Sequence, residues 1–282
     1  MTSKAKRIEA VLMAALARHE ADPDGLPTTG RFLFYELEQQ GDATKPDPTD
    51  TRPNRRRSMG WPPGSQDITD GLTRLRDRGD IPWEAIADTE RSLLVWDHAR
   101  SVADYVRERL DEATINPWGG PPPLILTESN GMAQVLRRVA AEHACPIGGT
   151  KGMTKGFLVT TVLPMLTGSG CRTVLYLGDL DRPGLQIEAN SRRVLEDALG
   201  ETLDWTRIGI LREQTTGLTP ITKTDGRTGV SSPGWEVEAL GQSAVVTLVR
   251  DALTALLPEP LRHVHEREQA ERDALREVLD AA

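Results

Sequence analysis

The sequence predicts an α/β protein in which a mostly helical amino-terminal domain precedes a parallel α/β domain. Apolar residues at helical spacing dominate the first part, a Pro/Gly tract interrupts the chain at 116–123, and strand-like apolar runs then alternate with helical patterns. The content of 27% charged and 38% hydrophobic residues excludes a disordered chain. We therefore expect domains at 1–115 and 124–257, with a charged helix at 258–282.

The amino-terminal part shows three helical patterns and one short strand-like run. Apolar residues recur at helical spacing in 4–21, 31–40 and 66–78. The stretch 42–64 is rich in Pro, Asp, Thr and Arg and predicts a loop, whereas 92–96 predicts a strand. Three helices and a short hairpin are the plan of a winged helix-turn-helix module, a kind of domain that usually binds nucleic acid.

Acidic residues follow two predicted strands of the second part. The buried runs 124–127 and 173–177 end at Glu128 and just before Asp179 and Asp181. Because the carboxyl ends of neighbouring parallel strands line one crevice, we expect these three carboxylates to converge. They would repel one another without a cation, and all-oxygen ligands favour Mg²⁺, with Mn²⁺ as an alternative. The competing interpretation is that the acids are solvated or cap helices.

A Glu after one strand and Asp-x-Asp after a later one resembles the Toprim domain of topoisomerases, primases and related nucleases. The segment 178–184, Gly-Asp-Leu-Asp-Arg-Pro-Gly, is most similar to the A subunit of topoisomerase VI and its relatives. The chain is shorter than that subunit. In this respect it resembles the reduced A-like proteins of mobile elements and the Toprim subunit of Wadjet plasmid-defence systems.

A second motif extends this resemblance to the amino-terminal domain. In the topoisomerase VI family, a winged-helix domain carries an Arg-x-x-(aromatic)-Tyr motif whose tyrosine attacks the DNA backbone, and Arg31 and Tyr35 match it. The resemblance implies that Tyr35 is the nucleophile, that Arg31 assists, and that the three acids bind Mg²⁺. It further implies a double-stranded DNA substrate, a homodimer with shared active centres, and a separate ATPase subunit for strand passage.

Clustered basic residues are candidates for contacts with DNA. Arg55, Arg56 and Arg57 are adjacent, and Lys151 and Lys155 belong to a Gly-rich turn that could receive phosphate oxygens. The alternative is that these side chains are simply solvated, and the net charge of −8 argues against a general nucleic-acid coat. No apolar run approaches the roughly 20 residues that span a bilayer, so we expect a cytoplasmic protein without membrane contact.

Three functions therefore remain open. The first is Mg²⁺-dependent DNA cleavage by Tyr35, which would leave a 5′-phosphotyrosyl link. The second is a hydrolytic Toprim nuclease of the plasmid-defence type, in which water attacks and Tyr35 is structural. The third is a non-catalytic DNA-binding subunit. Apart from the resemblance, Tyr35 lies beside Phe32, Phe34 and Leu37 in an amphipathic pattern, which is typical of a core aromatic.

Overall fold

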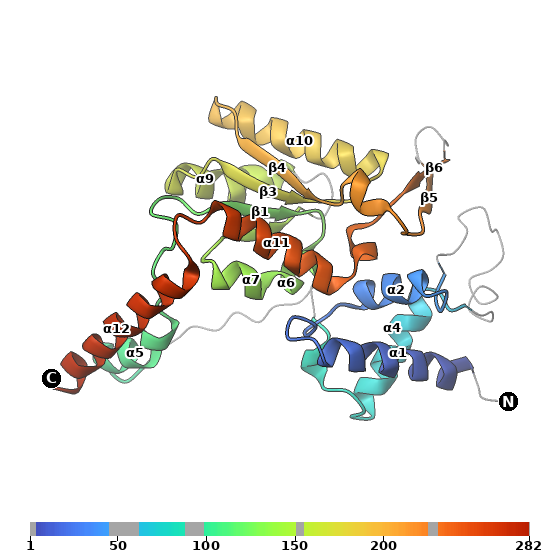
Figure 1. Cartoon of the computed structure of the whole chain (residues 1–282), viewed down its shortest axis with the longest axis horizontal. Helices are drawn as coiled ribbons and strands as arrows, with labels where there is room; N and C mark the ends of the chain where they lie inside the picture. The colour runs from blue at the N-terminus through green and yellow to red at the C-terminus, as the bar shows by residue number, and fades with distance from the viewer. Residues whose placement is uncertain (1–3, 45–61, 88–98, 151–154, 225–230, 282) are drawn as a thin grey trace.

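The computed structural model describes residues 4–44, 62–87, 99–150, 155–224 and 231–281. The chain folds as an α/β protein with a four-stranded parallel sheet (Figure 1). The elements before the sheet are α1 (Lys4–Glu20), α2 (Gly30–Gln39), α4 (Ser65–Asp77), the 3-10 turn η1 (Trp83–Ala85), α5 (Val102–Arg109) and the 3-10 turn η2 (Leu110–Glu112).

The sheet domain continues the strand and helix alternation that the sequence predicts. Its first elements are β1 (Leu124–Thr127), α6 (Asn130–Val135), α7 (Arg137–Glu142), β2 (Ile147–Gly149), α8 (Lys155–Phe157), the π-helical turn η3 (Leu158–Val162), α9 (Leu163–Ser169) and β3 (Thr173–Leu177). The later elements are α10 (Arg182–Leu199), β4 (Asp204–Gly209), η4 (Arg212–Thr215), β5 (Ile221–Thr224), β6 (Ser231–Gly234), η5 (Val237–Leu240), α11 (Gln242–Leu256) and α12 (Leu261–Asp280).

The three amino-terminal helices α1, α2 and α4 pack around one apolar core that includes Leu12, Leu33 and Ile68. Helix α2 begins where Thr29 accepts a hydrogen bond from the backbone N–H of Phe32, as expected of an N-cap threonine. The predicted strand at 92–96 lies outside the described residues. The winged-helix assignment therefore stays a prediction, while the three predicted helices are present.

The sheet has the strand order β2-β1-β3-β4, and all its pairs are parallel. Helices α9 and α10 cover one face, and α6, α7 and α11 cover the other (Figure 1). Alternate residues of each strand therefore enter different cores: Ile125 and Leu175 pack toward α11, whereas Leu126 and Tyr176 pack toward α9 and α10. Burial of both faces explains why β1 and β3 are continuously apolar in sequence.

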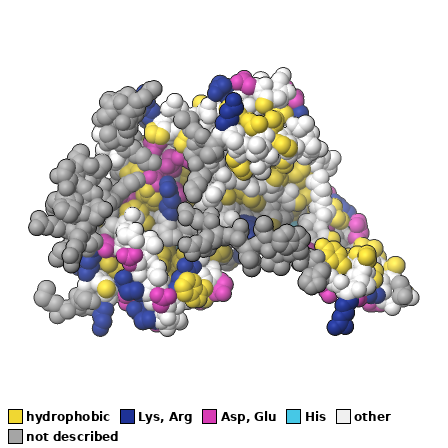
Figure 2. Space-filling model, turned by 180° about the vertical axis from the view of Figure 1, so that it is seen from behind, with side chains coloured by type: hydrophobic (Ala, Val, Ile, Leu, Met, Phe, Trp, Pro, Cys, Tyr) yellow, Lys and Arg dark blue, Asp and Glu magenta, His cyan; other side chains and the backbone are white. Residues whose placement is uncertain are grey.

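Helix α12 lies along α5 and forms with it an arm that projects from the sheet domain (Figure 1). The buried Glu268 of α12 accepts a hydrogen bond from the backbone N–H of Ile115, 3.0 Å away. Figure 2 shows apolar side chains on the surface of this arm, and Val102 and Val278 are among its exposed residues. The charged helix expected at 258–282 is thus present. Within the described residues, the structure has no helix with the length and apolarity needed to cross a bilayer.

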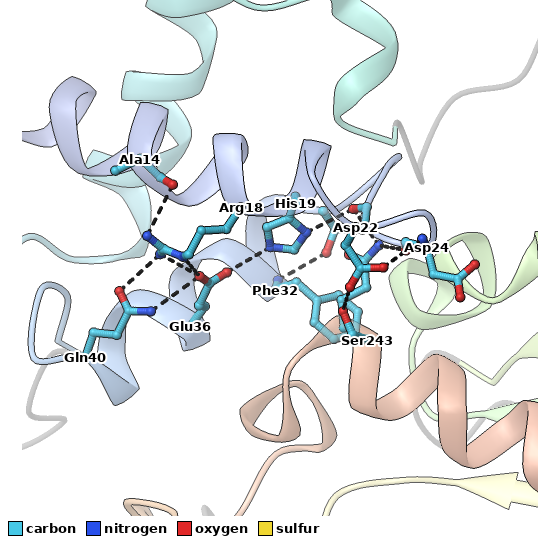
Figure 3. Close-up of polar contacts among 12 residues, drawn as sticks. Ala14, Arg18, His19, Asp22, Asp24, Phe32, Glu36, Gln40 and Ser243 are labelled. Atoms are coloured by element: carbon cyan, nitrogen blue, oxygen red, sulfur yellow. Dashed lines mark hydrogen bonds and ion pairs between the residues drawn. The ribbon is translucent and has the colours of Figure 1, made fainter.

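The turn between α1 and α2 fixes the amino-terminal helices against the sheet domain. The side-chain amide of Gln242 donates to the backbone carbonyls of Asp24, Gly25 and Pro27, at 2.8 to 3.2 Å. Figure 3 shows that Ser243 of α11 also points at Asp22 in this turn and hydrogen-bonds it. These contacts anchor the chain just before α2 begins, so α2 is held over the end of the sheet that carries the candidate site.

Candidate metal centre

Asp179 and Asp181, both in the loop that follows β3, have different structural roles. Asp181 is the N-cap of α10, and its Oδ1 accepts a hydrogen bond from the backbone N–H of Gly184 at 2.7 Å. A Cβ atom at residue 184 would lie 2.5 Å from the carbonyl oxygen of Asp179, so this close approach requires glycine. Pro183 fits the first turn of α10 because its missing N–H has no helical partner there. The Asp-Arg-Pro-Gly segment therefore starts a helix.

Asp179 belongs instead to a buried acidic triad with Glu236 and Glu238. One carboxylate oxygen of each residue lies within 4.8 Å of the others, and all three residues are buried. A backbone bridge aligns the two segments: Leu180 N–H donates to the carbonyl of Trp235 at 2.8 Å, and the reverse bond is 3.2 Å. The long-range bridge places the two glutamates, more than fifty residues further along the chain, beside Asp179.

Arg31 of α2 reaches from the amino-terminal helices into this acidic triad. Its Nη2 lies 2.5 Å from Glu236 Oε2 and 3.8 Å from Asp179 Oδ2, and its Nε lies 2.6 Å from Glu238 Oε1. The Arg31 side chain is 45% exposed, whereas those of the three acids are at most 6% exposed. The guanidinium therefore approaches the triad from the solvent side.

Tyr35, one turn further along α2, also contacts the acidic triad. The residue is 4% exposed, and its hydroxyl shares a hydrogen bond with Glu236. Burial and the negative charge of Glu236 raise the pKa of the Tyr35 phenol above its ordinary value, in spite of the nearby Arg31 guanidinium. The phenol is consequently protonated at neutral pH. The structure thus brings Arg31 and Tyr35 to the acids within a single chain.

Arg31 brings one positive charge to the three carboxylates of the acidic triad, which would carry −3 if all were ionised. Burial, together with the charges of Asp179 and Glu236, raises the pKa of Glu238 from 4.5 to about 7 against the opposing effect of Arg31. A divalent cation held by these carboxylate oxygens would relieve the repulsion among them, so these donors fit Mg²⁺ or Mn²⁺.

A cavity of about 460 Å³ opens beside the triad and contains the third predicted acid, Glu128. Arg31, Asp179 and Glu238 line the same cavity. Glu128 Oε2 accepts a hydrogen bond from the backbone N–H of Asp179 at 2.9 Å, so it helps to fix the loop that carries Asp179. Among the described residues, neither Glu128 nor Asp181 joins a group of three acids with ligand atoms within 4.8 Å.

The candidate DNA-binding residues are mostly outside the described part of the chain. Arg55, Arg56, Arg57 and Lys151 fall in segments whose placement is not described. Lys155 is described and lies exposed at the start of α8, a helix of one turn. The predicted contacts of these five residues with DNA stay predictions.

Glu236 and Glu238 are the site residues that the sequence did not reveal as functional. They alternate with Trp235, Val237 and Ala239 in an otherwise apolar stretch. Acids at every second position of an apolar segment are typical of a strand with one solvated face, so this pattern gives no sign that the two carboxylates are buried. Their burial is a finding of the structure.

Comparison with known proteins adds no further assignment: no protein-family model, curated protein or solved structure matches this chain. The resemblance to Toprim domains therefore stays a prediction from the sequence.

The raised pKa of Glu238 predicts a pH dependence of stability in metal-free protein. A carboxyl that titrates at about 7 when folded and near 4.5 when unfolded stabilises the fold below pH 4.5 and loses that contribution as the pH rises through 7. We expect a loss of about 3 kcal/mol in the free energy of unfolding between pH 4.5 and 8. Urea unfolding in EDTA should show this loss in the wild type and not in Glu238→Gln; equal pH profiles for the two proteins would contradict it.

Proposed function

We propose that this protein is a divalent-metal-dependent nuclease that hydrolyses phosphodiester bonds of DNA with water as the nucleophile. The observation that carries the proposal is the buried acidic triad, which adjoins a cavity that also contains Glu128. A cluster of carboxylate oxygen donors suits Mg²⁺ or Mn²⁺. The likeness of 178–184 to Toprim proteins supports DNA as the substrate.

Each acidic residue has a distinct part in this proposal. Asp179, Glu236 and Glu238 would hold the metal, which when bound neutralises charge that develops on the phosphate and lowers the pKa of water. Glu128 lies in the cavity wall, where its carboxylate can accept a proton from an attacking water. The backbone N–H of Asp179 orients Glu128 through their 2.9 Å hydrogen bond.

The surroundings of Tyr35 favour water over tyrosine as the nucleophile. Attack on phosphorus requires an accessible phenol oxygen and a base or cation that favours the phenolate. Tyr35 is 4% exposed, hydrogen-bonds to Glu236, and has a pKa raised above its ordinary value. In this environment the hydroxyl stabilises the Glu236 carboxylate and thereby positions it.

Tyrosine attack of the topoisomerase VI type is the second candidate, and one observation favours it. Arg31 and Tyr35 lie beside the acidic triad in the folded chain. In that family, however, the tyrosine of one protomer meets the metal of another, whereas here the two lie in one chain. This second function would also require a homodimer and a separate ATPase subunit for strand passage, and hydrolysis requires neither.

The two functions differ in what remains on the DNA end. With supercoiled plasmid and Mg²⁺ or Mn²⁺, we expect strand scission with protein-free ends when reactions are stopped by denaturant. Tyr35→Phe should still cleave and leave protein-free ends, at a rate about 10–100-fold below that of wild type, because it removes a hydrogen bond that positions the metal ligand Glu236. Tyr105→Phe, at an exposed tyrosine of α5, is the matched control.

The same experiment can exclude the proposed function. A covalent adduct on 5′ ends that disappears in Tyr35→Phe would replace hydrolysis with tyrosine attack. Absence of scission with either metal, together with salt-sensitive DNA binding, would instead indicate the non-catalytic DNA-binding subunit.

A further inference from the structure

We propose that Arg31 is a resident counter-cation of the acidic triad and that an incoming divalent metal displaces its side chain. The inference rests on the proposed metal centre and deepens it, because it states what the metal must compete with. It concerns the binding of the metal itself and does not depend on which nucleophile cleaves DNA.

The contacts of Arg31 conflict with simultaneous metal binding. Its guanidinium lies 2.5 Å from Glu236 and 2.6 Å from Glu238, so it occupies oxygens of two of the three acids. A divalent ion needs carboxylate oxygens at roughly 2.0–2.6 Å. A metal and a guanidinium bound to the same buried carboxylates would also repel each other strongly in a medium of low dielectric constant. One cation therefore has to leave when the other binds.

The structure provides a way for Arg31 to leave. Its side chain is 45% exposed and lines the cavity of about 460 Å³, so it can rotate out of the triad into solvent. Tyr35, at 4% exposure, has no such path. The freed guanidinium regains hydration, which offsets part of the loss of its carboxylate partners.

The backbone of α2 does not have to move with the Arg31 side chain. The Thr29 cap fixes the first turn of the helix, and the Gln242 amide holds the carbonyls of Asp24, Gly25 and Pro27 on the segment just before it. None of these contacts involves the acidic triad. Metal binding therefore exchanges one side chain for a metal ion and leaves the amino-terminal helices docked.

If Arg31 competes with the metal, only molecules in which the Arg31 side chain has left the acidic triad can bind it. The apparent metal affinity is then lowered in proportion to the fraction of such molecules. Minor conformers of this kind are typically populated at about 0.1–10%. Removing the competitor should then tighten metal binding by about tenfold or more. If Arg31 were instead a supporting residue of the metal site, its removal would weaken binding.

The test is Mn²⁺ binding to the full chain, measured by titration calorimetry and by the electron paramagnetic resonance signal of free Mn²⁺. Arg31→Gln should bind Mn²⁺ at least about tenfold more tightly than wild type. Arg31→Lys should also bind more tightly, by a smaller factor, because lysine keeps the positive charge but cannot contact both glutamates as the guanidinium does. Arg18→Gln is the matched control, since Arg18 pairs with Glu36 and is similarly exposed at 49%. Its affinity should equal that of wild type.

Thermal unfolding gives a second readout that needs no DNA. Without metal, Arg31→Gln should unfold at a lower temperature than wild type, and saturating Mn²⁺ should remove the difference. If Arg31→Gln does not fold, Arg31→Lys decides alone. If wild type binds Mn²⁺ and the Arg31 variants bind it equally or more weakly, Arg31 does not compete with the metal. That result would overturn the inference about Arg31 and leave the proposed metal centre standing. No binding to any variant would overturn both, and binding without DNA scission would contradict the nuclease alone.

Discussion

Asp179→Asn and Glu238→Gln should each lower Mg²⁺-dependent DNA cleavage and metal affinity by more than about 100-fold. Loss of an outer residue that merely supports a metal ligand typically costs 10–100-fold, so loss of a ligand should cost more. Both substitutions keep size and remove one negative charge from the buried acidic triad. Because they also relieve repulsion among carboxylates, neither should destabilise the fold strongly. Plasmid nicking and Mn²⁺ titration would measure the two effects.

Asp181→Asn is the matched control for this prediction, since it differs from Asp179→Asn by two positions in the same loop. Asp181 caps α10 through the Gly184 N–H, and asparagine caps a helix about as well as aspartate. We therefore expect metal affinity and cleavage within a few fold of wild type. A loss as large as that of Asp179→Asn would show that Asp181 is a metal ligand. The metal would then be bound by Glu128, Asp179 and Asp181, the set that the Toprim resemblance implies.

The elements that could be predicted from the sequence are those with strong local patterns. The largely apolar runs 124–127 and 173–177 coincide with β1 and β3, because strands buried on both faces are apolar at most positions. Helix α10 follows from its Asp-Arg-Pro-Gly start, which combines a cap with a proline in the first turn. These features depend on neighbouring residues, so they could be recognised without the fold.

Two strand pairings escaped prediction because they depend on distant residues or weak patterns. The stretch 223–234 has the polar, Gly-containing composition of a loop, yet its ends belong to the antiparallel strands β5 and β6. Pro233 and the glycines of this stretch are typical of loops, and the pairing shows itself only in the folded chain. The short strand β2, Ile147–Gly149, contains two glycines and likewise gives no periodic signal.

The candidate site was predicted in part for the same reason. Glu128 and Asp179 meet at one cavity because parallel strands end on the same side, which topology alone dictates. Sequence could not distinguish a metal ligand from a helix cap at Asp181, since aspartate suits both. Nor could it show that the bridge between Leu180 and Trp235 would bring Glu236 and Glu238 to Asp179. The contact of Arg31 with Glu236 and Glu238 depends on how the amino-terminal helices pack against the sheet, which no local pattern specifies.

Arg207→Met should lower the free energy of unfolding by about 1–3 kcal/mol, because it leaves a half-buried carboxylate without its cationic partner. The Arg207 side chain is 13% exposed and that of its partner, Glu188, is 15% exposed. The guanidinium also donates to the backbone carbonyls of Gly178 at 2.5 Å, Asp179 at 2.7 Å and Ile210 at 3.2 Å. It thus fixes the loop that presents Asp179, so metal affinity should fall together with stability.

The variants that accompany Arg207→Met separate its ion pair from its carbonyl contacts. Arg193→Met, which breaks an exposed pair with Asp197 at 3.0 Å, should cost less than about 1 kcal/mol. Adding Glu188→Met to Arg207→Met should restore the part of the loss that comes from the unpaired carboxylate, and a double-mutant cycle in urea measures this coupling. The carbonyls of Gly178 and Asp179 would still lack their donor, so metal affinity should stay low in the double variant. Full recovery of metal binding would show that Arg207 acts through Glu188 and does not hold the Asp179 loop.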